Sequence, residues 1–282
     1  MRSVKKSSLN RFVITALLLL LSCCALGPFV YLTLASFVGD MSQVFKNGLS
    51  LQITPDMLSV RNYIMLYTEQ QAVFFNWYKN STVITVLFTA ISLATSSMVG
   101  YGVTMYDFRG KRAYVVVIMS TMMIPIEILM LPLYKEMLAF GLINKYMGVV
   151  LPFAVSAFAI YFFMQFASTL PRELLDAGRV DGCGEFRIFL QIMGPLMLPA
   201  FGTMGILQAM VAWNDFLWPL IVMSTNANFT LTVGLQTYLN PYGNNYNMLF
   251  AGAVLSVVPI MLLFLFNQKS FVAGLTAGSV KG

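Results

Sequence analysis

The sequence predicts an all-α membrane protein with six transmembrane helices, and three observations support this fold class. Of the 282 residues, 58% are hydrophobic and only 10% are charged, whereas a soluble domain carries roughly 25% charged residues. The mean hydropathy is +0.76. Apolar stretches of about 20 residues, the length with which an α-helix crosses a bilayer, recur along the chain. Because backbone polar groups in lipid must be hydrogen-bonded internally, these stretches are expected to be helical.

Six spans are predicted from the apolar stretches. They cover residues 12–38, 80–105, 113–138, 148–168, 197–222 and 248–267. The first follows a basic N-terminus and, with Leu20-Leu21-Ser22-Cys23, resembles a secretory signal that carries a lipoprotein cleavage box. Its apolar run continues through Val38, beyond the roughly 7–15 residues of a signal core, so the first span is expected to be retained.

The distribution of basic residues predicts the orientation of these spans. Lys and Arg are enriched in the cytoplasmic loops of membrane proteins. With the N-terminus in the cytoplasm, twelve of the 17 Lys and Arg residues fall on the cytoplasmic side. The other five fall outside and are Lys46, Arg61, Lys79, Lys135 and Lys145. We therefore expect both termini in the cytoplasm, and residues 225–247, which contain no basic residue, in an outer loop.

The chain is expected to form one membrane-spanning domain flanked by two shorter segments. Residues 1–75 form an N-terminal segment with the first transmembrane helix and a periplasmic loop, residues 76–267 form the main transmembrane domain, and residues 268–282 form a cytoplasmic tail. The longest interruption between spans, residues 39–79, is expected to hold short helices at the outer membrane face. The many Met and Phe side chains are expected to pack the bundle and to face membrane lipid.

Composition excludes several classes of site. The net charge of +6 is not gathered into the basic patch that nucleic-acid binding needs. The chain contains no histidine, which excludes histidine metal sites, Ser-His-Asp triads and histidine proton relays. Cys23 and Cys24 lie in the first apolar stretch and Cys183 lies in a polar loop, so no disulfide framework is predicted. We expect no catalytic residue and no metal site.

The polar loop between the fourth and fifth spans, residues 170–195, carries the strongest functional signal. Pro171 suits the first turn of a helix, and Glu173 suits the positive end of the helix dipole. The loop is therefore expected to contain a short amphipathic helix over residues 173–181.

Small residues on this helix allow two interpretations. Gly178 and Gly182 are four residues apart and therefore share one helical face, where another protein could approach the backbone closely. Each glycine inside a helix costs up to about 1 kcal/mol relative to alanine, which favours a contact or a turn over plain solvation. Alternatively, the segment is a solvated loop in which Gly182 and Gly184 end a helix.

The spacing within this loop carries a family resemblance. The loop reads Asp176-Ala177-Gly178, then three residues, Gly182, then nine residues and Ile192-Met193-Gly194-Pro195. This pattern resembles the Glu-Ala-Ala loop of binding-protein-dependent ABC importer permeases. The chain departs from that pattern at Asp176, Gly178 and Gly194. The resemblance implies a type I ABC importer permease fold, in which this loop is a coupling helix seated in a cleft of a cytoplasmic ATPase. The docking face it implies consists of Asp176, Ala177, Gly178, Asp181 and Gly182.

Nucleotide chemistry is expected on another polypeptide. The chain has no Gly-x-x-x-x-Gly-Lys-Ser/Thr loop, and Gly110-Lys111-Arg112 lacks the context that cradles phosphate. We therefore expect no cofactor on this chain, with ATP and Mg on the partner ATPase, and no enzymatic activity of its own.

Two further segments resemble carbohydrate permeases in particular. Residues 212–220, Ala-Trp-Asn-Asp-Phe-Leu-Trp-Pro-Leu, look like the signature of the fifth span in these proteins. The C-terminal residues look like the tail of the maltose-type second permease, which inserts along the ATPase dimer interface. The implied contact residues are Gly278, Ser279, Val280, Lys281 and Gly282. The implied partners are a second permease, two copies of an ABC ATPase and an extracytoplasmic solute-binding protein, in a bacterial inner membrane. The implied cargo is a sugar or a related polyol.

Polar residues within the predicted spans are candidates for a translocation path. An ionisable residue at membrane depth indicates either a pathway or a buried partner. The candidates are Glu127, Trp213, Asn214 and Asp215. Both carboxyl groups could instead be protonated or hydrogen-bonded to helix ends opened by proline, and tryptophan is also common at membrane interfaces. In the maltose-type family the partner permease makes most of the substrate contacts. The alternative function is an ion-coupled secondary carrier that uses Glu127 and Asp215.

Overall fold

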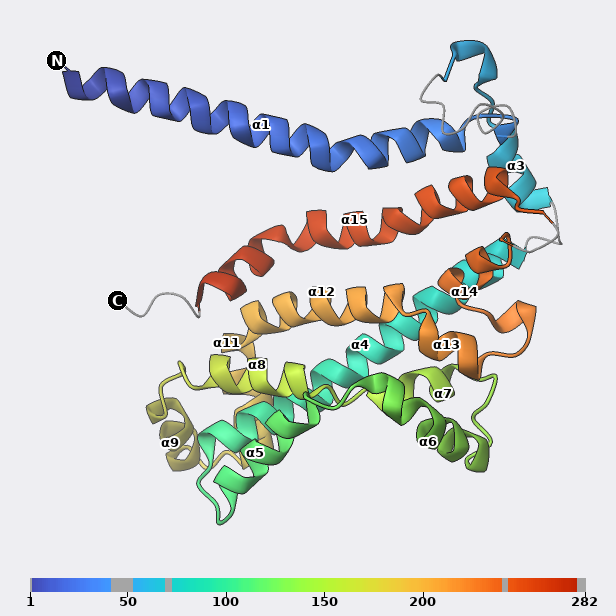
Figure 1. The fold of residues 1–282 in the computed structure, drawn as a ribbon. Coiled ribbons are helices and arrows are strands. Elements are labelled where there is room, and N and C mark those ends of the chain that lie inside the picture. Colours follow the sequence, from blue (N-terminus) through green and yellow to red (C-terminus); the bar gives the residue numbers. More distant parts are fainter. Residues whose placement is uncertain (1, 42–52, 69–72, 240–242, 278–282) are drawn as a thin grey trace. The chain divides into compact units, whose positions relative to one another are not determined.

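The computed structural model describes residues 2–41, 53–68, 73–239 and 243–277 (Figure 1). These residues form helices and one isolated β-bridge, between Val38 and Leu58, and no strand. The all-α fold class is therefore confirmed. The chain divides into two compact units. Unit 1 comprises Met1–Phe74 and Leu235–Val257, and unit 2 comprises Phe75–Gly234 and Val258–Gly282.

Three of the predicted spans are single helices. They are α1 (Arg2–Ser36), α4 (Val73–Met105) and α15 (Tyr246–Ala277). Each contains a stretch that is long and apolar enough to cross a membrane, at Arg11–Ser36, Val73–Met105 and Tyr246–Phe266. These stretches match the spans predicted at residues 12–38, 80–105 and 248–267. α15 continues through residue 268, where the tail was predicted to begin, so the domain boundaries stay predictions.

The structure breaks the other three predicted spans, which the sequence led us to expect as continuous helices. α5 (Lys111–Thr121) and α6 (Ile126–Ala139) meet at 98°. α7 (Tyr146–Val150) and the 3-10 turn η3 (Leu151–Phe153) meet α8 (Ala157–Ala167) at 49°. α12 (Leu198–Asn214) follows the segment Glu185–Leu196 at 82° and is separated from α13 (Leu217–Val222) by two residues. With each bent pair counted as one span, the described residues contain up to six spans.

The breaks have local causes. Pro125 precedes α6 in an extended conformation, with ψ at 133°, and proline has no N–H with which to continue the preceding helix. Ser156 is extended as well, and its Oγ accepts a hydrogen bond of 3.2 Å from the Ala159 N–H, which caps α8. Asp215 ends α12 with ψ at 128°. Apolar residues lie on both sides of each point, so hydropathy alone predicted a continuous span at each of them.

Unit 1 holds the end of α1 against two other helices. Its short helices are η1 (Pro55–Met57) and α3 (Arg61–Thr68), which confirm the short helices predicted for residues 39–79. The fully buried Asn62 amide donates hydrogen bonds of 2.9 Å and 2.8 Å to the carbonyls of Ser36 and Val38. Asn247, at the start of α15, donates to the Gly39 carbonyl at 2.9 Å. Hydrogen bonds from these two asparagines thus fix the turn that leaves α1.

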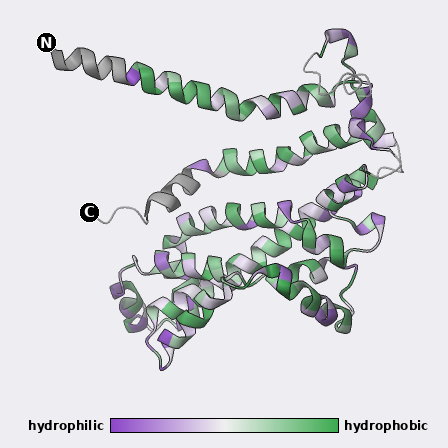
Figure 2. Cartoon of the chain, in the orientation of Figure 1, coloured by the Kyte–Doolittle hydropathy of each residue, from purple (hydrophilic) through white to green (hydrophobic). Residues whose placement is uncertain are grey.

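Unit 2 packs around α4 in two hydrophobic cores, and Figure 2 shows hydrophobic residues along α4, α8 and α12. The first core joins the C-terminal half of α4 to α8 and α12 through residues that include Tyr101, Phe163, Met193 and Met204. The second joins the N-terminal half of α4 to α6, α7 and α13 through residues that include Ile84, Met137, Val150 and Trp218. The remaining elements are α9 (Glu173–Val180), α10 (Glu185–Ile188), the π-helix η4 (Phe189–Met193), α11 (Gly194–Leu196), η5 (Asn226–Asn228) and α14 (Leu231–Gln236).

Candidate functional site

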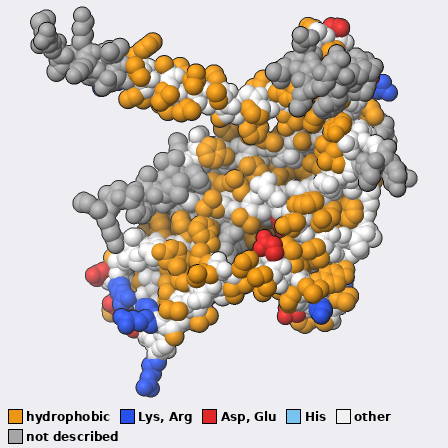
Figure 3. All heavy atoms as spheres, in the orientation of Figure 1, with side chains coloured by type: hydrophobic (Ala, Val, Ile, Leu, Met, Phe, Trp, Pro, Cys, Tyr) orange, Lys and Arg blue, Asp and Glu red, His pale blue; other side chains and the backbone are white. Residues whose placement is uncertain are grey.

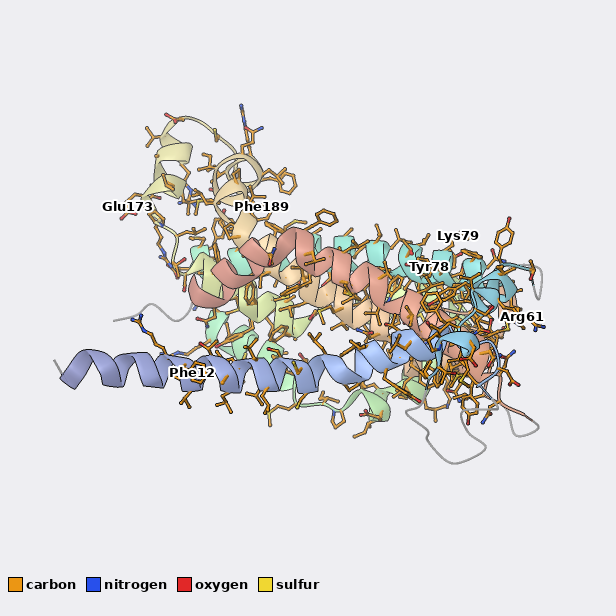
Figure 4. The ribbon with its side chains drawn as sticks, turned by 90° about the horizontal axis from the view of Figure 1, so that it is seen from above. Phe12, Arg61, Tyr78, Lys79, Glu173 and Phe189 are labelled. Atoms are coloured by element: carbon orange, nitrogen blue, oxygen red, sulfur yellow. The ribbon has the colours of Figure 1, made fainter. Side chains whose placement is uncertain are left out.

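The loop singled out in the sequence forms an arm at one end of unit 2, which we call the α9 arm (residues 172–193). In Figure 4, Glu173 and Phe189 lie on this arm, whereas Tyr78 and Lys79 lie at the opposite end of the unit. The predicted helix over residues 173–181 is present as α9, with Glu173 in its first turn. After α9, Gly182 adopts a φ of +77°, which glycine reaches without the strain that a side chain brings. Gly182 therefore ends the helix, as the alternative interpretation proposed.

The two glycines of the arm have different surroundings. Gly178 is buried, and a Cβ atom at this position would lie 2.9 Å from Ile192 Cδ1 and 3.0 Å from Ile188 Cγ1. A Cβ atom at Gly182 would have no neighbour within 4 Å. Two isoleucines of the same arm thus occupy the space beside Gly178, whereas the space beside Gly182 is open.

The outer surface of the α9 arm carries the other predicted docking residues. Asp176, Ala177, Asp181 and Gly182 are all exposed. Two large apolar side chains are exposed beside them, Val180 at 88% and Phe186 at 64%. Acidic and apolar groups therefore share a surface that a partner protein could cover.

A group of three side chains fastens the arm to the end of α4. The Tyr106 hydroxyl lies 2.5 Å from Glu185 Oε2, and Arg179 Nε lies 2.7 Å from Glu185 Oε1. The Arg179 guanidinium also lies over the Tyr106 ring, 5.8 Å from its centroid. Burial and the hydrogen bond to Glu185 raise the pKa of Tyr106, so the phenol stays protonated and is the donor. We call this group the Tyr106–Glu185–Arg179 cluster.

A second ionic group fixes the start of the arm. Arg172 lies 3.3 Å from an Asp107 carboxylate oxygen and donates to the Thr104 carbonyl at 3.1 Å. Lys111 lies 3.2 Å from the other carboxylate oxygen. Lys111 and Arg172 together hold the pKa of the Asp107 carboxyl below its ordinary value. Figure 3 shows Lys and Arg side chains gathered at this end of unit 2.

A cavity of about 570 Å³ lies in unit 2 where three helix breaks meet. Its lining includes the first residue of α6, the turn between η3 and α8, and the turn between α12 and α13. Gln208, Val211 and Ala212 line it from one face of α12, as their spacing of three and four residues requires, and Asp215 lines it directly after the helix. The rest of the lining consists of Ile84, Phe88, Ile126, Val149, Pro152, Phe153, Val155, Ser156, Phe158 and Asn214.

Two of the four predicted path residues line this cavity. They are Asn214 and Asp215, and the side chains of both also make hydrogen bonds to backbone groups. The Asn214 amide donates to the Met210 carbonyl at 2.9 Å, and the Asp215 carboxylate accepts from the N–H groups of Phe216 and Trp218 at the start of α13. Asp215 thus lines the cavity and also makes hydrogen bonds to a helix end.

The structure does not bring the other two path residues to the cavity. Trp213 is buried and packs edge-on against Tyr78, with ring centroids 5.5 Å apart. Glu127 is exposed in the first turn of α6. Neither lines the cavity among the described residues.

The sequence analysis missed Gln208, although a signal was available. It lies in the apolar run from Gly205 to Ala212, where a single amide is the only strongly polar side chain. The predicted path residues were Glu127 and three neighbours at 213–215, and Gln208 lies outside both groups. The predicted tail contacts, Gly278 to Gly282, lie outside the described residues. Within the described part of the chain, no group of three or more Cys, Asp or Glu side chains could hold a metal ion.

Comparison with known proteins adds family information to this geometry. Residues 90–276 match the family described as binding-protein-dependent transport system inner membrane component. The chain is 46% identical over 282 residues, 100% of both proteins, to the arabinooligosaccharides transport system permease protein AraQ of Bacillus subtilis (strain 168). It is 37% identical over 202 residues to the lactose transport system permease protein LacG of Rhizobium radiobacter, covering 72% of this chain and 74% of that one.

Its fold is also similar to that of a solved structure. A chain in the crystal structure of a bacterial ABC transporter involved in the import of the acidic polysaccharide alginate matches with a TM-score of 0.81 at 22% identity. The match covers 94% of this chain and 98% of that one, which confirms the importer permease fold. Together, the family match and the full-length relative show that the chain belongs to the family of inner membrane components of binding-protein-dependent transport systems.

Proposed function

We propose that this chain is the membrane-spanning permease subunit of an ATP-driven importer of neutral sugars or short oligosaccharides. The observation that carries the proposal is the 46% identity, over the whole chain, to a permease named for arabinooligosaccharide transport. Other relatives are named for lactose, melibiose and maltodextrin transport. The family consists of transport components and not of enzymes. The chain would form half of the translocation path, with Asn214 and Asp215 on its lining.

The proposed assembly contains a second permease, two copies of an ABC ATPase that bind ATP and Mg, and an extracytoplasmic solute-binding protein. The α9 arm is the proposed contact with the ATPase, through Asp176, Ala177, Asp181 and Gly182. Its exposed acidic and apolar surface and its two attachments to α4 support this role. We further propose that Gly278 to Gly282 contact the ATPase.

We propose a cytoplasmic location for both termini and for the α9 arm. The arm and Lys79 lie at opposite ends of unit 2 (Figure 4), in agreement with the sides assigned from the basic residues. The secondary-carrier alternative finds no support. Asp215 is bonded to backbone N–H groups, Glu127 is not among the residues that line the cavity, and the chain belongs to a family of binding-protein-dependent transport components.

The proposal is tested with the purified complex in proteoliposomes, supplied with the binding protein, arabinotriose and ATP. We expect uptake that needs ATP and stops in the Gly182→Asp variant, with the complex still inserted. Gly110→Asp is the matched control, because Gly110 also has a positive φ, of +87°, and open space around a Cβ atom, but lies outside the arm. Uptake without ATP, or normal uptake in Gly182→Asp, would refute the coupling role.

A further inference from the structure

The cavity contains a polar group that the fold leaves without a partner. Gln208 lies in α12, is only 3% exposed as a residue, and lines the cavity. Among the described residues, its Nε2 atom has no hydrogen-bond partner. A buried amide without a partner destabilises the folded protein. The arrangement is explained if a bound molecule supplies the missing acceptor.

The other polar side chains of the cavity are already engaged. The Ser156 hydroxyl accepts from the Ala159 N–H, the Asn214 amide donates to the Met210 carbonyl, and the Asp215 carboxylate caps α13. Gln208 Nε2 is therefore the buried polar side-chain atom of this lining that has no hydrogen-bond partner among the described residues. The remaining lining is apolar and includes three phenylalanines, Phe88, Phe153 and Phe158.

This chemistry fits one unit of a neutral sugar. An amide N–H pairs with a hydroxyl or ring oxygen, and aromatic rings cover the apolar C–H face of a sugar ring. A cavity of about 570 Å³ is within the usual size range of small-molecule sites. Transporters place substrate sites where interrupted helices meet near the centre of the membrane. The breaks before α6, before α8 and between α12 and α13 border this cavity.

We propose that this chain itself binds the transported solute, at a subsite where Gln208 Nε2 donates a hydrogen bond to an oxygen of a neutral sugar unit. The inference rests on the proposed import function and adds a specificity-determining contact on this subunit. It differs from the expectation that the partner permease makes most of the substrate contacts.

The experiment uses the whole transporter in proteoliposomes with arabinotriose as the probe, and measures uptake and ATP hydrolysis together. Gln208→Met keeps the side-chain length but removes the donor. We expect uptake to fall about tenfold, the effect of one lost hydrogen bond in a desolvated site, while the loaded binding protein still stimulates ATP hydrolysis. Gln165→Met is the matched control, because Gln165 is exposed on the neighbouring helix α8 and does not line the cavity.

Each outcome decides between specific interpretations. Uptake by Gln208→Met at the wild-type level overturns the proposal. Loss of the second permease from the purified Gln208→Met complex also overturns it, since the amide would then pair with that subunit.

If Gln208→Met lowers the amount of this chain in the membrane, a second variant, Ala212→Leu, tests the proposal, because leucine fills the cavity one turn further along α12. Reduced uptake with intact ATP hydrolysis supports the subsite, and unchanged uptake refutes it. Wild-type protein without ATP-dependent uptake instead refutes the import function.

Discussion

The Tyr106 hydroxyl donates a 2.5 Å hydrogen bond to Glu185 Oε2 and thereby joins the end of α4 to the start of α10. Arg179 of α9 contacts both residues, through an ion pair with Glu185 and through the face of the Tyr106 ring. Side chains therefore attach the arm to the end of α4, although the two segments lie far apart in the sequence. A displacement of α9 would reach α4 directly through this cluster.

Tyr106→Phe tests this route. The variant keeps the ring and its contact with Arg179 but loses the hydrogen bond to a charged acceptor, which is stronger than a neutral one. We expect about threefold to tenfold less solute transported per ATP hydrolysed, with the complex intact. Uptake and ATP hydrolysis measured on the same proteoliposomes give this ratio. Tyr114→Phe, on an exposed tyrosine of α5, is the control, and an unchanged ratio in Tyr106→Phe would show that the arm acts without this bond.

Charge reversal tests the ion pair within the same cluster. Arg179→Glu and Glu185→Arg each place like charges where Nε and Oε1 now lie 2.7 Å apart, so each single variant should loosen the arm. The double variant restores opposite charges and should recover part of the lost transport. The measurement is the rate of trypsin cleavage in the α9 arm, compared with uptake. Two single variants and a double variant that behave alike would contradict a role for the pair.

Gly178→Leu tests the packing of the arm. The new side chain would collide with Ile188 and Ile192, whose atoms lie 2.9 Å to 3.2 Å from the position of a Cβ atom. We expect a loss of about 1–3 kcal/mol in stability, typical of an overpacked core, measured as a lower melting temperature of the purified complex. Gly184→Leu is the control, since a Cβ atom there has no neighbour within 4 Å. Equal melting temperatures for the two variants would mean that the arm opens freely at Gly178.

The sequence predicted the membrane class, the three spans that are single helices and the helix of the arm, because each depends on local hydrophobicity or on local turn residues. Gly182 ends α9 through its own backbone conformation, which is a local property. Gly178 is different, since its burial depends on Ile188 and Ile192 folding back onto α9 through the following turn. Their spacing in the sequence made the two glycines look alike, and it could not show that Gly178 is buried and Gly182 exposed.

The cavity could be predicted only in part for a similar reason. Asp215 was a candidate because an ionisable residue in an apolar run is conspicuous, but its bonds to the start of α13 depend on a break that the hydrophobic pattern does not show. Gln208 was overlooked although its unpaired amide lines the same cavity. The helix breaks bring these groups together, and a break inside a uniformly apolar stretch leaves little trace in composition.

Asp215→Asn separates the two transport mechanisms considered for this chain. The asparagine side-chain oxygen can still accept from the N–H groups at the start of α13, so the helix keeps its cap. ATP-driven uptake should therefore stay within about threefold of the wild-type rate, whereas Asp215→Leu removes the acceptor and should cost about 0.5–2 kcal/mol of stability. The decisive measurement compares uptake driven by ATP with uptake driven by an imposed proton or sodium gradient. An ion-coupled carrier would respond to the gradient in the wild-type protein and would lose that response when the carboxylate is replaced, whereas an importer permease responds only to ATP and keeps its uptake in Asp215→Asn.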